Sequence, residues 1–220
     1  MIVVFEGLHG CGKTTQIDVL SEHLKSLGMN NIIISSWNSH YLINPVLNTM
    51  KSKQIGENFS LALAHALDFN LRIEEIRKKA KTSFVIFDRY IYTAFARDCS
   101  RGIDRNVVEV LYSNYIEPDI VFFLDIPVSL SVQRVINGKD TRSDYITGRD
   151  LYPDKNDCES MLHYFESQRE VYINMLTQKE NSYLVNAERS IDAQKKYIWD
   201  RIKRRIKINK KAEDSNEKRS

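Results

Sequence analysis

A glycine-rich segment near the N-terminus has the residue types and the spacing that bind the phosphates of a nucleoside triphosphate. It matches the pattern GxxxxGK[ST] and consists of Gly7, Leu8, His9, Gly10, Cys11, Gly12, Lys13, Thr14 and Thr15. Glycines let backbone N–H groups turn toward phosphate oxygens, and the N-terminus of a following helix adds positive potential. We expect Lys13 to reach the β- and γ-phosphates and the Thr14 hydroxyl to bind Mg²⁺.

A second candidate pair, Asp88 and Arg89, follows a short apolar run at residues 84–87. A carboxylate at the end of a strand beside the phosphate loop can orient Mg²⁺ through water, as a Walker B acid does. The planar guanidinium of Arg89 suits a second phosphate group. The same two residues could instead cap a helix and lie on the surface, but their place at a strand end favours the functional interpretation.

Five short apolar runs supply the strands that must position these residues. They occupy residues 2–5, 31–35, 84–87, 120–124 and 183–185. Continuous rather than alternating apolar runs are typical of strands that are covered on both faces. Helical patterns fill residues 13–27, 58–80, 105–115, 128–137, 157–178 and 190–207. This alternation predicts an α/β fold with a parallel sheet and right-handed crossovers.

The composition predicts a cytoplasmic chain that binds neither a membrane nor nucleic acid. Of its 220 residues 42% are apolar, but no apolar run approaches the roughly 20 residues that span a bilayer. Three widely spaced cysteines exclude a disulfide scaffold and fit a reducing compartment. The net charge of +3 arises in residues 203–220, which hold eight basic and three acidic residues, whereas the remaining body carries −2. A nearly neutral body is not typical of a nucleic-acid-binding surface.

Several further motifs, in this order, resemble the thymidylate kinase family of nucleoside monophosphate kinases over roughly residues 1–205. The family's opening and its DR[YH] motif are similar to Phe5-Glu6-Gly7 and Asp88-Arg89-Tyr90. Its central and C-terminal segments are similar to Glu117-Pro118-Asp119, Leu124-Asp125-Ile126-Pro127, residues 165–172 and Val185-Asn186-Ala187.

The resemblance implies transfer of the γ-phosphoryl group of ATP to dTMP, giving ADP and dTDP, with Mg²⁺ as the metal. It implies a five-stranded parallel sheet of the P-loop NTPase type, with helices on both faces and a lid at about residues 135–156. The kinase domain would then span 1–207. Residues 208–220 are polar and charged without periodicity, so we expect them to form a disordered tail. The partners implied are nucleotide substrates and a second copy of the chain, with the helix at 58–80 as one possible dimer face.

Donor-site roles also follow from the resemblance. Ala187 would lie near the adenine, and Arg134 would end the helix that leads into the lid. Because the phosphate loop contains no arginine, the lid would supply the catalytic one, with Arg142 as the first choice and Arg149 as the second. A solvated basic loop is the alternative interpretation of this segment.

Four departures from the family concern the acceptor side. His9 replaces an aspartate, Ser35-Ser36-Trp37-Asn38 replaces an Arg-Glu-Pro segment, Phe69 stands where an arginine reads the base, and Arg97-Asp98 replaces a Tyr-Gln pair. The residues expected to line the acceptor pocket are Trp37, His65, Phe69, Arg72, Arg89, Tyr92 and Arg97. Core packing is an equal alternative for His65 and Phe69. A different nucleotide or nucleoside acceptor, or an ATP-binding module without catalysis, remains the alternative to dTMP phosphorylation.

Overall fold

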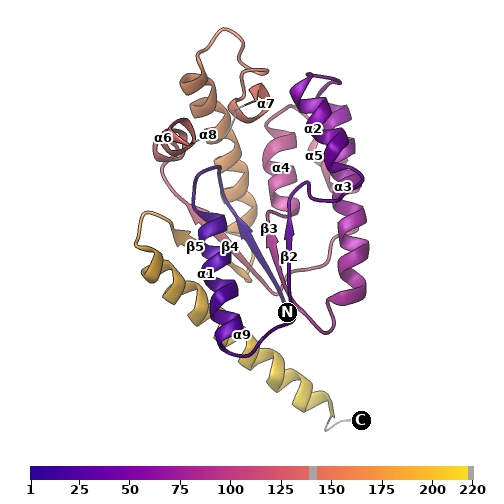
Figure 1. Cartoon of the computed structure of the whole chain (residues 1–220), viewed down its shortest axis with the longest axis vertical. Coiled ribbons are helices and arrows are strands. Elements are labelled where there is room, and N and C mark those ends of the chain that lie inside the picture. The colour runs from indigo at the N-terminus through magenta and orange to yellow at the C-terminus, as the bar shows by residue number, and fades with distance from the viewer. Residues whose placement is uncertain (139–142, 218–220) are drawn as a thin grey trace.

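A single parallel sheet in the order β2-β3-β1-β4-β5 forms the centre of the molecule (Figure 1). The computed structural model describes residues 1–138 and 143–217. The strands are β1 (Ile2–Glu6), β2 (Ile32–Ser36), β3 (Phe84–Asp88), β4 (Ile120–Asp125) and β5 (Ser182–Asn186). β1 is wholly buried, whereas the edge strands β2 and β5 are partly exposed. The five apolar runs therefore became the five strands of the predicted parallel sheet.

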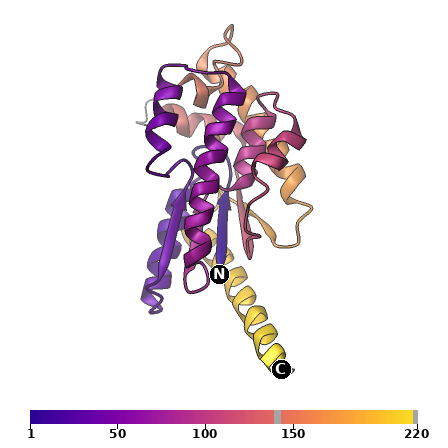
Figure 2. The same ribbon diagram turned by 90° about the vertical axis from the view of Figure 1, so that its right-hand side faces the viewer.

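Helices cover both faces of the sheet, as the side view shows (Figure 2). Alternate residues of β1 point to opposite faces: Val3 and Phe5 pack in a core with α1 (Lys13–Ser26) and α9 (Ile191–Glu217). Val4 packs in the other core with α3 (Asn58–Lys79), α4 (Ile91–Cys99) and α8 (Asp157–Leu176). Cores on both faces explain why the strand runs are apolar throughout.

The remaining described helices are α2 (Asn44–Ser52), α5 (Arg105–Leu111), α6 (Val128–Asn137) and α7 (Asp144–Thr147). The sequence patterns did not predict α2, α4 or α7. Residues 91–98 of α4 are all buried, including the polar Thr93, Arg97 and Asp98, so this helix has no exposed polar face. Only Leu47 is buried in α2, and α7 has four residues.

Helix α9 continues to Glu217, ten residues beyond the expected helix end at 207. The expected disorder of the charged tail at 208–220 stays a prediction. No helix among the described residues is long and apolar enough to cross a membrane. The phosphate loop and the residues after β3 both lie at the carboxyl ends of parallel strands, where α/β proteins bind their ligands.

Candidate active site

The phosphate loop joins β1 to α1 through three glycines with positive φ. Gly7, Gly10 and Gly12 have φ values of 142°, 73° and 97°. A Cβ atom on Gly7 would lie 2.5 Å from the carbonyl oxygen of Leu124, and one on Gly10 would lie 3.1 Å from the Cβ of Arg134. Both the backbone conformation and close packing require glycine at Gly7, whereas at Gly10 the positive φ favours glycine and a Cβ atom would be tightly packed.

The ammonium group of Lys13 lies within this loop. Its Nζ donates hydrogen bonds to the carbonyl oxygens of Gly7 at 3.1 Å and Leu8 at 2.9 Å. Burial, reinforced by the nearby Arg89, lowers the pKa of Lys13. An entering phosphate would offer this buried cation the anionic partner that neutral carbonyl oxygens do not provide.

Asp88 and Arg89 stand at the end of β3, beside the phosphate loop. Within the described residues Asp88 Oδ1 is buried and has no hydrogen-bond partner. Arg89 has a φ of 73°, unusual for a residue with a side chain, and its Nη1 donates to the carbonyl oxygen of Gly7 at 3.0 Å. Strained backbone of this kind is retained where neighbouring contacts hold it in place.

Glu6, the last residue of β1, holds the turn that carries Arg89. Its Oε1 accepts hydrogen bonds from the backbone N–H groups of Tyr90 at 2.7 Å and Thr93 at 3.1 Å. The Thr93 hydroxyl donates to Oε2 at 2.6 Å and lies 2.7 Å from the Tyr172 hydroxyl of α8. Burial raises the pKa of Glu6, against the lowering effect of these hydrogen bonds and of Arg89. The start of the phosphate loop and the turn after β3 are therefore joined at one fully buried carboxyl group.

A pocket of about 690 Å³ opens next to this junction. Its walls come from the phosphate loop, the ends of β2 and β3, α2, the last turn of α4 and the segment around α7. The lining residues are His9, Ser36, Trp37, Asn38, Asn48, Lys51, Ser52, Asp88, Arg89, Arg97, Ser143, Tyr145 and Ile146. The volume lies in the range of small-molecule sites.

Three of the seven residues expected to line the acceptor pocket do line it: Trp37, Arg89 and Arg97. His9 of the phosphate loop, where the family has an aspartate, lines it as well. His9 Nε2 lies 3.3 Å from Arg97 Nη2. Burial and the cationic groups of Arg89, Arg97 and Lys13 hold the pKa of His9 well below its usual value. His9 is therefore neutral, and its Nε2 lone pair can accept a hydrogen bond from Arg97.

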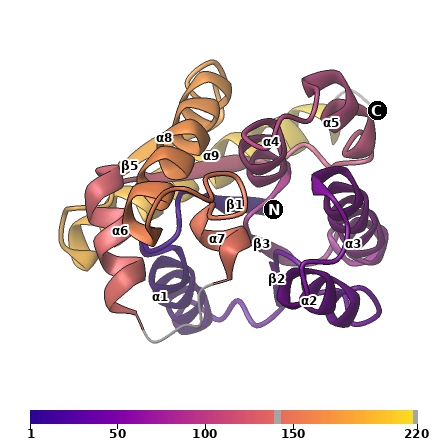
Figure 3. The same cartoon turned by 90° about the horizontal axis from the view of Figure 1, so that it is seen from above.

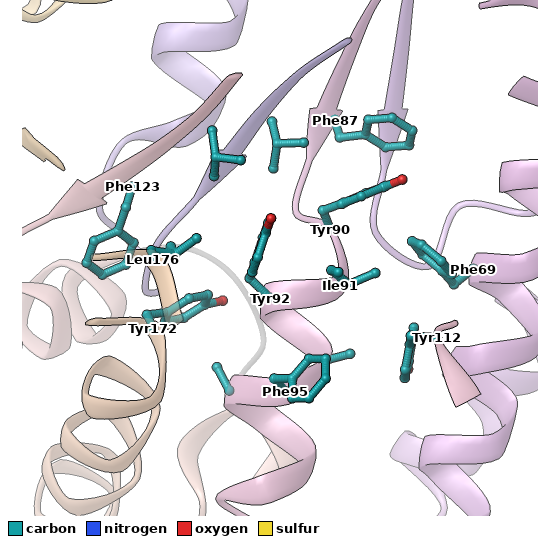
Figure 4. Packing of buried hydrophobic residues seen from close by; sticks show 14 of the residues in the cluster. Phe69, Phe87, Tyr90, Ile91, Tyr92, Phe95, Tyr112, Phe123, Tyr172 and Leu176 are labelled. Carbon is teal, nitrogen blue, oxygen red and sulfur yellow. The ribbon is translucent and has the colours of Figure 1, made fainter. Parts of the chain in front are cut away.

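Four other predicted acceptor residues do not line the pocket. Phe69 and Tyr92 are fully buried among aromatic side chains, Phe69 against Tyr90 and Tyr112 (Figure 4). His65 is 1% exposed, and its ring packs in tilted contacts against the rings of Trp37 and Tyr145. The guanidinium of Arg72 binds Asp68 at 2.7 Å and Ser35 at 2.9 Å. Phe69 packs in the core, in agreement with the core-packing alternative, because its face of α3 is turned toward the sheet. His65 is buried behind Trp37 and Tyr145, which line the pocket.

The predicted donor-side residues are spread around the phosphate loop. Arg134 Nη1 donates to the carbonyl oxygen of Gly10 at 3.1 Å, which fixes α6 against the loop. Ala187 is buried after β5, and its N–H donates to the carbonyl oxygen of Asp125 at 2.9 Å. Arg149 pairs with Asp157 at 3.1 Å and lines a different hollow. Arg142, the first choice for a lid arginine, lies outside the described residues.

Sequence reasoning missed the contribution of α2 and α7 to the pocket. Lys51 comes from α2 and Tyr145 from α7. The one available signal was Pro45 at the first turn of α2, because proline is common at that position. Among the described residues no cluster of three or more His, Cys, Asp or Glu side chains could hold a metal ion by itself.

A parallel sheet in this strand order, with a GxxxxGKT loop between β1 and α1, defines a P-loop nucleotide-binding protein. The family model "Thymidylate kinase" matches residues 5–198. The chain belongs to the thymidylate kinase family.

Relatives and a solved structure agree with this assignment. A thymidylate kinase of Thermosipho melanesiensis is 28% identical over 211 residues, which cover 94% of this chain and 97% of the relative. One from Fervidobacterium nodosum is 28% identical over 198 residues, covering 87% and 93%. The crystal structure of thymidylate kinase from Ehrlichia chaffeensis has a TM-score of 0.69 at 20% identity, covering 92% and 98%, and supports the fold.

Proposed function

We propose that this protein transfers the γ-phosphoryl group of ATP to dTMP, giving ADP and dTDP, with the residue roles set out below. Membership of the thymidylate kinase family carries the reaction class. The observation that supports the residue roles is the junction of the phosphate loop with Asp88 and Arg89 beside the 690 Å³ pocket. A nucleoside acceptor, or a module without catalysis, is not favoured by the family match.

In the proposed reaction an oxygen of the dTMP phosphate attacks the γ-phosphorus of ATP. The bond from this phosphorus to the bridging β,γ-oxygen breaks, and that oxygen leaves with ADP. Such transfers have loose, strongly anionic transition states, so catalysis consists mainly of positioning and charge stabilisation. Lys13 would bind the β- and γ-phosphates, and Arg89 would hold the acceptor phosphate.

The phosphate loop, from Gly7 to Thr15, would bind the donor phosphates through its backbone N–H groups. Arg134 would keep α6 packed against that loop, and Ala187 would lie near the adenine. Arg142 is proposed as the lid arginine that spans the transferring group, with Arg149 as the second choice. Within the pocket, Trp37, Arg97 and His9 would contact the acceptor.

The residues present fit a Mg²⁺ ion that arrives with the nucleotide. Thr14 lies exposed in the first turn of α1, and the buried Asp88 Oδ1 lacks a hydrogen-bond partner among the described residues. Mg²⁺ keeps several waters and is commonly bound through one or two protein oxygens plus substrate phosphates. When bound, it would neutralise charge on the β- and γ-phosphates. Thr14 would bind the ion and Asp88 would orient its water.

A homodimer is proposed through α3. Phe59, Leu63 and Leu67 are 51%, 45% and 51% exposed and recur every fourth residue, so they form an apolar stripe on the helix. We expect wild-type protein to sediment as a dimer and Leu63→Glu as a monomer. A monomeric wild type would contradict this. We also propose a reducing, cytoplasmic setting, in keeping with Cys11, Cys99 and Cys158, which are all free thiols.

The product balance tests the proposed reaction. We expect dTMP and Mg-ATP to give dTDP and ADP in equal amounts, separated by anion-exchange chromatography. Lys13→Ala should abolish both products while the circular dichroism spectrum is retained. Formation of ADP without dTDP would contradict phosphoryl transfer to dTMP.

A further inference from the structure

Two segments that donor chemistry does not use, α2 and α7, meet at the acceptor pocket. Lys51 Nζ of α2 lies 5.1 Å from the centre of the Tyr145 ring of α7. Next to this pair, Gln54 Nε2 donates to Asp144 Oδ2 at 2.8 Å. Seen from above, α7 lies between α6 and α2 (Figure 3). Lys51 and Tyr145 both line the pocket, so their contact forms part of its wall.

Arg101, which follows α4, fixes the position of Tyr145. Its Nη2 donates to the backbone oxygen of Tyr145 at 2.7 Å, and its guanidinium carbon lies 3.9 Å from the centre of the Tyr145 ring. Its Nε donates to the Tyr164 hydroxyl of α8 at 2.9 Å. Only 7% of Arg101 is exposed. Arg101 therefore holds the ring that Lys51 faces, and Tyr164 of α8 holds Arg101 in turn.

The ammonium group of Lys51 has no hydrogen-bond or carboxylate partner in the part of the chain that the structure describes. Its contact is with the Tyr145 ring. Burial lowers the pKa of Lys51 to about 7, and Arg97 and Arg101 add to this effect while Asp68 opposes it. A partly buried ammonium among other cations is costly unless a ligand supplies oxygen acceptors.

Other polar groups of the pocket wall also lack partners among the described residues. They include Trp37 Nε1, Asn38 Oδ1 and the Tyr145 hydroxyl, all buried. The residues that carry these atoms line the pocket, but the atoms themselves are buried in its wall. Buried polar atoms are normally hydrogen-bonded, so this wall has unused hydrogen-bonding capacity.

Two arginines beside the phosphate loop provide planar guanidinium groups for the acceptor phosphate. Arg89 contacts the loop at Gly7, and Arg97 contacts it at His9. Lys51 comes from α2, a separate wall of the pocket. At the position where a base-reading arginine was expected, Phe69 is instead buried in the core. A side chain other than residue 69 must therefore donate the hydrogen bond that recognises the base.

We infer that Lys51, positioned by Tyr145, reads a carbonyl oxygen on the pyrimidine ring of the acceptor nucleotide. An ammonium group donates hydrogen bonds and accepts none, so it matches the O4 carbonyl of thymine. Cytosine carries an amino group at that position, which would place donor against donor. This inference rests on the proposed function, and it assigns to Lys51 the selection of dTMP over dCMP.

Steady-state kinetics of Lys51→Met with dTMP, dCMP and ATP tests this. Methionine keeps the length of the side chain and removes the charged donor. We expect KM for dTMP to rise about 10- to 100-fold, because hydrogen bonds to charged groups contribute about 1.5–3 kcal/mol. KM for ATP should stay unchanged, and the preference for dTMP over dCMP should fall by the same factor. Lys51→Arg should restore part of the preference.

The control is Lys53→Met, which changes an exposed lysine just beyond α2 and should behave as wild type. Tyr145→Phe, which keeps the ring, should retain much of the preference that Lys51→Met loses. An equal rise of KM for dTMP and dCMP, or no rise, would overturn the inference while leaving the proposed function intact. A wild type that does not phosphorylate dTMP would overturn both.

Discussion

Arg89 Nη1 donates a hydrogen bond to the carbonyl oxygen of Gly7 at 3.0 Å, which joins the end of β3 to the start of the phosphate loop. The same carbonyl oxygen accepts from Lys13 at 3.1 Å. Two cations that would hold different phosphates, one of the donor and one of the acceptor, thus share one backbone atom. This shared contact sets the distance between the two phosphate sites.

Removal of the Arg89 guanidinium should abolish most turnover. We expect Arg89→Ala to lower kcat with dTMP by about 10²- to 10³-fold, the usual effect of deleting one charge-stabilising donor, with Arg89→Lys intermediate. Arg105→Ala, which breaks an exposed pair with Glu109, serves as the control. Wild-type kcat/KM in Arg89→Ala would contradict the assigned role.

The backbone at Arg89 gives a second test that separates stability from function. Because φ is 73°, Arg89→Gly should be as inactive as Arg89→Ala but more stable by about 1 kcal/mol. Urea denaturation of the two variants measures this difference. Equal stability would show that the positive φ at this position stores no strain.

Substitution of Thr14 or Asp88 should raise the Mg²⁺ concentration that the enzyme requires. EDTA is expected to stop turnover, and Thr14→Ala should raise the Mg²⁺ concentration for half-maximal rate about 10- to 100-fold. Asp88→Asn, which keeps the size and removes the charge, should shift it in the same direction. Ser26→Ala, at the exposed end of α1, is the matched control. An unchanged Mg²⁺ requirement in Thr14→Ala would rule out its hydroxyl as a ligand.

Asp98 should make stability fall with rising pH. Burial raises its pKa to about 7, despite the lowering effect of Arg97 and Arg101. The folded-state pKa lies above the unfolded value of 3.8, so the folded protein binds the Asp98 proton more tightly than the unfolded chain does. This proton binding stabilises the fold fully below about pH 4, and the stabilisation is lost as pH rises through about 7. At 1.36 kcal/mol per unit the loss is roughly 4 kcal/mol.

The measurement compares wild type with Asp98→Asn, because other groups titrate equally in both. The free energy of unfolding of Asp98→Asn relative to wild type should increase by roughly 4 kcal/mol between pH 4 and pH 8. Urea denaturation at four pH values gives this difference. A difference that does not vary with pH would mean that Asp98 titrates normally.

Acceptor affinity should depend on the protonation of Lys51. With a pKa of about 7, the ammonium fraction falls about tenfold between pH 6 and pH 8, so KM for dTMP should rise by about that factor. Arginine stays charged, so Lys51→Arg should lose this rise. The titration of the dTMP phosphate is common to both variants and cancels in the comparison.

The groups that face Lys51 set the size of that effect. They are Arg97 of α4, Arg101 after it, Asp68 and His65 of α3, His9 of the phosphate loop and Tyr145 of α7. Burial keeps both histidines neutral and raises the pKa of Tyr145, so these three do not titrate in this range. A rise of KM that persists in Lys51→Arg would assign the pH dependence to another group.

The donor side could be predicted from the sequence because its signals are local. Gly7 to Thr15 form one continuous motif, and the apolar runs before and after it predict the strands without knowledge of distant contacts. Asp88 and Arg89 were found in the same way, since the carboxyl ends of neighbouring parallel strands lie at one edge.

The acceptor side could be predicted only in part, because tertiary packing decides it. Phe69 and Trp37 are both aromatic, yet α3 turns Phe69 into the core while Trp37, just beyond β2, faces the pocket. Lys51 and Tyr145 lie on short helices of nine and four residues, and Arg101 positions Tyr145 for their contact. No local pattern in the sequence indicates that contact.

The acceptor preference of the wild-type protein tests the central claim most directly. ADP release would be followed with Mg-ATP and dTMP, dCMP, dUMP, dGMP, dAMP or thymidine as acceptor. We predict the highest kcat/KM for dTMP, with dTDP as product and no turnover of thymidine. Turnover of another acceptor in preference to dTMP, or ATP binding without turnover of any acceptor, would contradict the claim.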